Sequence, residues 1–136
     1  MKKVYVASDH AGFELKKRLV LYLADKGYEV DDMGPHVYDK EDDYPDIIIP
    51  LAEKVAKSKG LGIVIGGSGQ GEAIAANKVK EVRAIVFYGL IKATKAIDIK
   101  GKKSSDPYEI LRLSRTHNDA NILSIGGRFL DEKIIK

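Results

Sequence analysis

The 136-residue chain is predicted to fold as an α/β domain in which five parallel strands alternate with helices. Short apolar, β-rich runs recur along the sequence, and amphipathic segments with helical spacing lie between them. Consecutive strands joined by helices form parallel sheets with right-handed crossovers. The prediction is therefore a doubly wound, five-stranded sheet with helices on both faces, which is a three-layer αβα arrangement.

Five segments are predicted as strands because each is short, apolar and bounded by turn residues. They are residues 4–8, 28–32, 61–65, 82–87 and 121–125. The expected helices are residues 14–26, 47–57, 72–78 and 109–115. Gly27 is placed to end the first helix, and Pro50 suggests that the second helix starts later than Ile47.

Length and composition limit the kinds of protein that this chain can be. A single domain spanning residues 1–136 is expected, because this length suffices to bury one hydrophobic core. The net charge of +3, with basic residues spread among acidic ones, gives no reason to expect a nucleic-acid partner. The absence of cysteine excludes disulfides, a thiolate nucleophile and cysteine metal sites. No run is apolar enough to span a membrane, and no signal peptide precedes the first strand, so a cytoplasmic location is expected.

The stretch 61–78 combines a buried strand, a glycine-rich loop and the start of a helix. Its glycines free the backbone, so that successive N–H groups can point at one spot, where the helix dipole adds positive potential. Glu72 lies where the loop becomes the helix. A carboxylate beside a group of N–H donors suits the enolisation of a sugar, which needs a base and donors for the resulting oxyanion.

The glycine-rich loop also fits roles that involve no oxyanion. Residues 67–71 run G-x-G-x-G rather than G-x-G-x-x-G, and no Gly-Lys-Ser/Thr sequence closes the loop as in a P-loop. Nucleotide binding is therefore disfavoured, whereas a tight structural turn accounts for the loop alone about as well as an anion site does. Glu72 in a first helical turn would also serve as a partner of the helix dipole.

Further candidates follow the other strands, because ligands of such sheets bind beyond the carboxyl ends of the strands. Asp9 and His10 follow the first strand, Tyr44 follows the second, and Arg128 follows the fifth. Taken singly, each of these side chains is more often structural than functional. A metal site formed by Asp9, His10 and His117 is not expected, because no two of them have ligand spacing on one helix.

Several motifs in a fixed order carry a family resemblance. The motifs are VASDHAG at 6–12, DYP at 43–45, GGSGQGEAIAANK at 66–78, SRTHNDAN at 114–121 and GGR at 126–128. With these motifs the chain resembles the type B ribose-5-phosphate isomerases, within a wider group that includes galactose-6-phosphate isomerases. The resemblance covers most of residues 1–130.

The resemblance implies a Rossmann-like fold and an aldose–ketose isomerase that acts through a cis-enediolate without metal or cofactor. The implied substrate is ribose 5-phosphate, which would be converted to ribulose 5-phosphate. Two alternatives are an isomerase of another sugar phosphate, such as a hexose 6-phosphate, and a non-catalytic sugar-phosphate-binding module. The family also implies a homodimer, or a dimer of dimers, with sites at the subunit interface.

The resemblance implies roles for individual residues. Many members place a cysteine base at the end of the third strand, which is position 66 here, but a second branch uses a glutamate in a GGSGxGE pattern. This sequence matches the second branch, so Glu72 is the implied base. The implied anion hole consists of Gly67, Ser68, Gly69, Gly71 and the neighbouring N–H groups. The other implied roles are substrate binding near the ring oxygen by Asp9, ring opening by His117, phosphate contacts by His10 and Arg128, and sugar contacts by Tyr44 and Asn118.

Two segments depart from the family pattern. Residues 89–117 are long for one crossover, and residues 98–107 are polar and turn-rich, so a loop between two helical pieces is expected. The excess length, within 89–113, would reshape the pocket or the dimer seam. The last helix is expected to be cut short at Lys136, without the arginines that reach the phosphate in other members.

Overall fold

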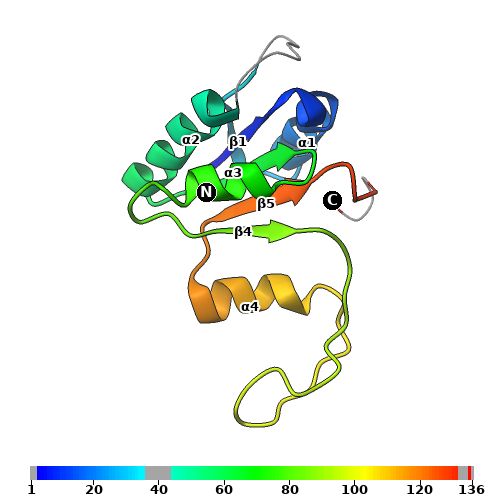
Figure 1. Cartoon of the computed structure of the whole chain (residues 1–136). Coiled ribbons are helices and arrows are strands. Elements are labelled where there is room, and N and C mark those ends of the chain that lie inside the picture. The colour runs from blue at the N-terminus through cyan, green and yellow to red at the C-terminus, as the bar shows by residue number, and fades with distance from the viewer. Residues whose placement is uncertain (1–2, 36–43, 132–134, 136) are drawn as a thin grey trace.

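The computed structural model describes residues 3–35, 44–131 and 135, and within these it contains a five-stranded, all-parallel sheet. The strand order is β2-β1-β3-β5-β4. The strands are β1 (Lys3–Ser8), β2 (Glu29–Asp32), β3 (Leu61–Gly66), β4 (Ala84–Phe87) and β5 (Ile122–Gly126). The helices are a short 3-10 helix η1 (His10–Gly12), α1 (Phe13–Asp25), α2 (Tyr44–Ser58), α3 (Gln70–Ala76) and α4 (Glu109–Asn118). The predicted α/β class is confirmed (Figure 1).

Side chains that alternate along the strands build a core on each face of the sheet. On one face, Val64 of β3 and Ile122 of β5 pack with the buried residues of α2 and α3. On the other face, Ile65 and Ile125 pack with Leu19 of α1. Neighbouring residues of one strand thus serve opposite layers, as a parallel sheet covered on both sides requires.

Helix α2 begins at Tyr44, earlier than the sequence suggested, so that Pro50 lies inside the helix. An interior proline removes one backbone hydrogen bond and costs about 3 kcal/mol. Pro50 is exposed, whereas Ile48, Leu51 and Val55 are fully buried against the sheet. Burial of this apolar face outweighs the local cost, because tertiary packing supplies most of a helix's stability.

The connection between β4 and α4 differs from the expected pair of helical pieces. The second piece is present as α4, but residues 88–106 contain no helix, so the prediction of a first piece is wrong. Ile91 and Ile99 are exposed there, and a short helix with no packed face is not stable in water. The segment instead turns at Gly101, whose φ is +83°, and the Ile97 N–H donates to the Lys102 carbonyl at 2.8 Å.

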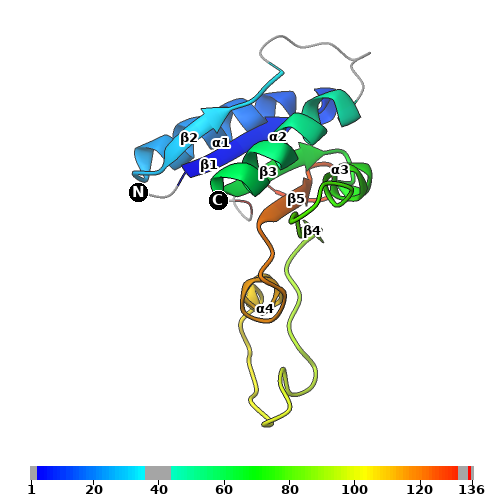
Figure 2. The ribbon, with the colours of Figure 1, turned by 90° about the vertical axis from the view of Figure 1, so that its left-hand side faces the viewer.

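Helix α4 itself stands apart from the rest of the domain. None of its residues is buried, and Figure 2 shows α4 and the segment before it projecting from the sheet beyond β4. The described helices include none that is both long enough and apolar enough to cross a membrane.

Candidate active site

The glycine loop lies at the carboxyl end of β3 and is fixed from β5. Gly69, the N-cap of α3, has a φ of +80°, which favours glycine because other residues strain there. Its carbonyl accepts one hydrogen bond from the Ala73 N–H at 3.1 Å and another from the Ser124 hydroxyl at 2.6 Å. The Ser68 hydroxyl accepts from the Gln70 N–H at 3.3 Å. The loop that precedes α3 is therefore held in one shape before any ligand arrives.

Glu72 lies in the first turn of α3 and is only 4% exposed. A Cβ atom added to Gly66 would lie 1.7 Å from Glu72 Oε1, so the carboxyl group fills the space directly beside the end of β3. Any side chain at position 66 would compete with the carboxyl group for this space. A side chain at position 66 and the Glu72 carboxyl group are therefore alternatives for one location.

The electrostatic surroundings raise the proton affinity of Glu72. Burial raises the pKa of its carboxyl group above the usual 4.5, and the negative charge of Asp9 raises this pKa further, while a backbone hydrogen bond opposes the rise. A carboxylate whose pKa is moved toward neutrality is a better base for a carbon-bound proton. Two carboxyl groups that influence one another at the end of a sheet are typical of functional sites.

Asp9 is held by the backbone on both of its sides. Its Oδ1 accepts from the Ala11 N–H at 2.8 Å and from the Gly12 N–H at 3.2 Å, so it caps η1. Its own N–H donates to the Ile65 carbonyl of β3 at 3.1 Å. His10, the first residue of η1, follows directly. The ends of β1 and β3 therefore bring Asp9, His10 and Glu72 to one edge of the sheet.

Arg128 lies against the glycine loop from the β5 side. The backbone N–H of Arg128 donates to the Gly67 carbonyl at 3.0 Å, and the backbone N–H of Gly127 donates to the Gly66 carbonyl at 2.8 Å. Its guanidinium Nη1 would lie 3.2 Å from a Cβ placed on Gly67, so the charged group extends over the loop. A guanidinium beside several backbone N–H groups is an arrangement that can hold a phosphate.

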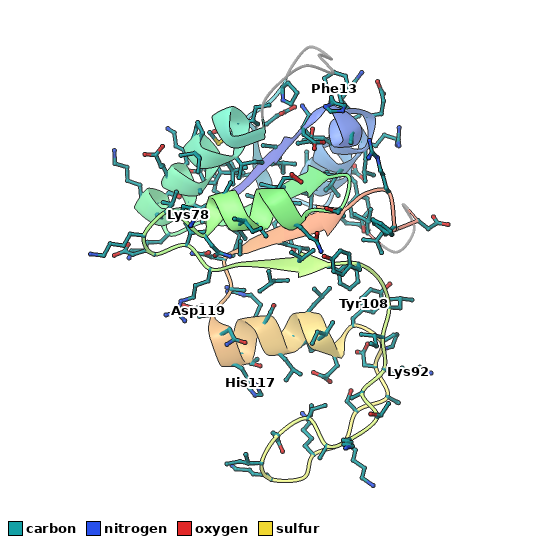
Figure 3. All side chains as sticks on the ribbon, viewed as in Figure 1. Phe13, Lys78, Lys92, Tyr108, His117 and Asp119 are labelled. Atoms are coloured by element: carbon teal, nitrogen blue, oxygen red, sulfur yellow. The ribbon has the colours of Figure 1, made fainter. Side chains whose placement is uncertain are left out.

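His117 and Asn118 lie at the opposite edge of the sheet. They form the last turn of α4, which continues through Asp119 into the start of β5, and the Asn118 carbonyl accepts from Arg83 Nη1 at 2.9 Å. Figure 3 shows His117 on the side of α4 that faces away from the sheet, far from Phe13 at the start of α1. One chain therefore does not bring His117 and Asn118 together with Glu72. Asp43 and the side chain of Tyr44 lie outside the described residues, although Tyr44 begins α2.

Two residues near the site were missed in the sequence. Ser124 is fully buried and supports the glycine loop, and Lys16 is 1% exposed on the inner face of α1. A serine inside the apolar run NILSI was a signal for Ser124, since a buried hydroxyl needs a partner. Lys16 lies three residues before Leu19 and seven before Leu23, so helical spacing placed it on the apolar face.

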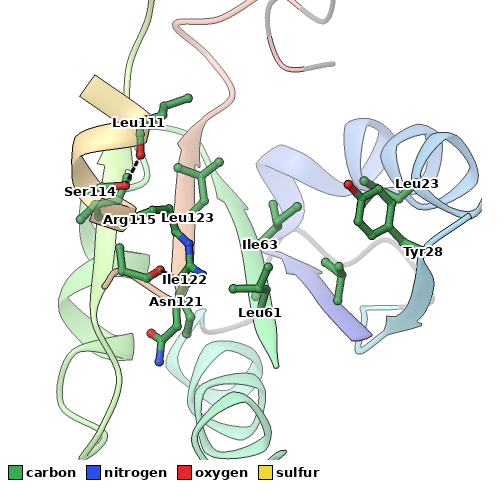
Figure 4. Close-up of a pocket in the computed structure, with 14 residues that line it drawn as sticks. Leu23, Tyr28, Leu61, Ile63, Leu111, Ser114, Arg115, Asn121, Ile122 and Leu123 are labelled. Carbon is green, nitrogen blue, oxygen red and sulfur yellow. Dashed lines mark hydrogen bonds between the residues drawn. The ribbon is translucent and has the colours of Figure 1, made fainter. Parts of the chain in front are cut away.

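A separate apolar cavity lies away from these residues. It has a volume of about 270 Å³ and lies between the sheet and α4, where Leu61, Ile63 and Leu123 meet Leu111 (Figure 4). Arg115 is the one charged side chain among its described lining residues, and there is no carboxylate to act as a base. This cavity therefore lacks the chemistry of the glycine loop. The described residues also include no group of three or more histidines, aspartates and glutamates placed to hold a metal ion.

The fold and the carboxyl edge define an α/β domain in which a buried carboxyl group lies beside a glycine-rich loop, an arrangement able to serve as a base and an anion site. The model of a protein family described as Ribose/Galactose Isomerase matches residues 4–101 of this chain. The chain belongs to this family.

Similar proteins agree with this assignment. Ribose-5-phosphate isomerase B of Mycolicibacterium paratuberculosis is 41% identical over 127 residues, which are 93% of this chain and 69% of that protein. The crystal structure of ribose-5-phosphate isomerase B from Mycoplasma genitalium with bound ribulose 5-phosphate has a TM-score of 0.81 at 35% identity. That match covers 98% of this chain and 77% of the other. The Clostridium thermocellum enzyme matches with a TM-score of 0.79 at 38% identity, over 98% of this chain and 78% of the other.

Proposed function

We propose that this chain interconverts ribose 5-phosphate and ribulose 5-phosphate through a cis-enediolate, with Glu72 as the base. The observation that carries the proposal is the Glu72 carboxyl group, which is buried beside Gly66 at the glycine loop and has a raised pKa. The similar proteins support the choice of substrate, because they are named ribose-5-phosphate isomerase B and one was crystallised with ribulose 5-phosphate.

The proposed reaction moves one proton between two carbons. Glu72 takes the proton from C2 of the open-chain aldose, and the electron pair of the broken C–H bond forms the C1–C2 double bond of the enediolate. The N–H groups of the loop from Gly67 to Glu72 hold the negative oxygen, which favours the intermediate over the free sugar. The proton of the C2 hydroxyl then passes to the negative oxygen on C1, the C2 oxygen becomes the carbonyl of the ketose, and the electron pair of the double bond takes the proton back from Glu72 at C1.

The remaining groups bind the sugar and open its ring. Asp9 and His117 exchange protons at the ring oxygen, since a cyclic pentose phosphate must first expose its carbonyl. His10 and Arg128 bind the phosphate, for which Arg128 is suited by its planar, charged fork. Tyr44 and Asn118 bind sugar hydroxyls.

His117 and Asn118 reach the site from a second subunit in this proposal. They lie on the amino edge of the sheet, whereas Glu72 lies on the carboxyl edge. A two-fold dimer pairs the same two surfaces twice, so each amino edge would meet the partner's carboxyl edge and two complete sites would form. The exposed α4, which has no buried residue in the single chain, supports this arrangement.

A binding module without catalysis fits the site less well. Burial of a carboxyl group next to a second carboxyl group opposes ionisation, and both groups repel a phosphate. Such an arrangement weakens anion binding but helps a base. Isomerisation of a hexose 6-phosphate uses the same groups, so the substrate has to be measured.

An isomerisation assay on a panel of pentose and hexose phosphates tests the proposal. Ribose 5-phosphate should have the highest kcat/KM, and Glu72→Gln should lower kcat by roughly a hundredfold to ten-thousandfold, as removal of a general base does. Glu53→Gln, an exposed change on α2, is the matched control and should leave kcat unchanged. Near-parental turnover by folded Glu72→Gln would refute the assignment of the base.

A further inference from the structure

Lys16 is the largest fully buried side chain of the described domain, and its charge is matched by three acceptors. Its ammonium group donates to Asp32 Oδ1 at 2.8 Å, to Asp32 Oδ2 at 3.0 Å and to the Pro35 carbonyl at 2.8 Å. These bonds use every proton of the ammonium group. Lys16 therefore joins α1 both to the end of β2 and to the turn of residues 33–35, which we call the 33–35 turn.

The 33–35 turn in turn holds the end of β1. Asp32 Oδ1 also accepts from the Gly34 N–H at 2.9 Å, which shapes the turn. The Gly34 carbonyl then accepts from the Ser8 N–H at 3.1 Å, one residue before Asp9. On the other side, Asp9 is held by the Ile65 carbonyl of β3. The backbone around Asp9 is thus fixed from β3 directly and from β2 through the bonds that Lys16 makes.

A buried lysine is a poor choice if stability alone is required. Removing the ammonium group from water costs nearly as much as its attraction to the partly exposed Asp32 returns, and apolar residues of similar size often stabilise a core as well or better. The neighbouring Lys17 shows the usual alternative, because its side chain is 55% exposed while its ammonium group lies over the same Phe13 ring. The three directed hydrogen bonds of Lys16 fix the position of the 33–35 turn relative to α1, whereas apolar packing would define that position less sharply.

We propose that Lys16 is a positioning residue for the isomerase reaction, because its contacts with Asp32 and Pro35 hold the 33–35 turn against Ser8 and thereby fix Asp9 beside Glu72. This inference rests on the proposed function, since it assigns Lys16 a role in that same site. Lys16 touches neither substrate nor base and acts through Asp9.

The test compares Lys16→Met with Lys17→Met, in the full chain and in both the parental and the Asp9→Asn backgrounds. Lys16→Met should lower kcat/KM for ribose 5-phosphate by roughly tenfold to a hundredfold, which is the size of loss that a misplacement of about 1 Å can cause. Lys17→Met should change nothing. In the Asp9→Asn background, Lys16→Met should cause little further loss, because residues that act through one another are not additive.

Amide hydrogen exchange supplies a readout that does not depend on activity. Lys16→Met should speed exchange at the Ser8 and Gly34 amides, while the central strands β3 and β5 keep their protection. If Lys16→Met does not fold, Asp32→Asn weakens the same contacts with little change of shape and should give the same two results. Full activity of a folded variant, additive losses with Asp9→Asn, or unchanged exchange at Ser8 would each overturn the proposal. A parental chain inactive on every sugar phosphate would refute the proposed function and with it the role of Lys16 in the reaction, whereas exchange at Ser8 and Gly34 separately tests whether Lys16 holds the 33–35 turn.

Discussion

The carboxyl edge of the sheet and the projecting α4 carry the two halves of the predicted site, but they are built in opposite ways. At the carboxyl edge, buried bonds fix each loop, such as Ser124 to Gly69 and Lys16 to Asp32. In α4 no residue is buried, and His117 and Asn118 lie at its exposed end. Glu72 and the glycine loop, which would transfer the carbon-bound proton, lie within one chain. His117 and Asn118, which would assist that transfer, lie on the exposed α4. This difference supports the proposal that His117 and Asn118 serve the site of a neighbouring subunit.

Among changes that keep Glu72 itself, the largest effect on turnover is expected from one that disturbs the carboxyl edge alone. Gly66→Ala places a methyl group where the Glu72 carboxyl group lies, so the base must move by more than 1 Å. We expect kcat to fall by about a hundredfold, because misplacement of this size can cost as much. Gly89→Ala is the matched control, since the nearest atom to its Cβ, Leu130 Cδ2, is 3.8 Å away. An unchanged kcat for folded Gly66→Ala would show that Glu72 is not confined to this space.

A smaller effect is expected at Arg128, which is proposed to bind the phosphate. Arg128→Ala removes a charge over Gly67, and a hydrogen bond to a charged group contributes about 1.5–3 kcal/mol, so KM should rise by roughly tenfold or more. The kcat value should change less, because the reacting carbons lie away from the phosphate.

Inhibition by inorganic phosphate checks this placement independently. It should be weak and should weaken further in Arg128→Ala. Tight inhibition that survives Arg128→Ala would place the anion elsewhere. If joint replacement of Lys100, Lys102 and Lys103 then abolished it, the segment before α4 would hold the phosphate instead.

The smallest effect concerns the coupling between Asp9 and Glu72. The charge of Asp9 raises the pKa of Glu72, and Glu72 acts as a base only when it is deprotonated. Asp9→Asn removes that charge, so the pKa of Glu72 falls and the acid limb of the kcat/KM profile should move to lower pH. Lys17→Met, which leaves Asp9 and Glu72 untouched, should keep the parental profile. An acid limb that stays in place for Asp9→Asn would mean that another group controls it.

Periodicity predicted the strands and the main helices because each has an apolar face with a clear spacing. It placed the start of α2 too late and predicted a helical piece within residues 88–106 that is absent, for opposite reasons. Burial of Ile48 and Leu51 stabilises α2 despite the proline inside it. Ile99 is fully exposed, so no buried apolar face stabilises a helix there. The motifs led to Glu72, but the contacts of Ser124 and Lys16 join segments far apart in the sequence. Such contacts depend on the strand order, which a single sequence does not state.

Mixing two inactive variants tests most directly whether the two halves come from different subunits. Glu72→Gln and His117→Ala are purified separately, unfolded, refolded together and assayed on ribose 5-phosphate. In a mixed dimer one site has lost both residues and the other keeps both, so random pairing should restore about a quarter of parental kcat. Each variant refolded alone should stay inactive. No recovery in a mixture shown to contain mixed dimers would contradict the two-subunit site, because His117 would then serve the glycine loop of its own chain or neither loop.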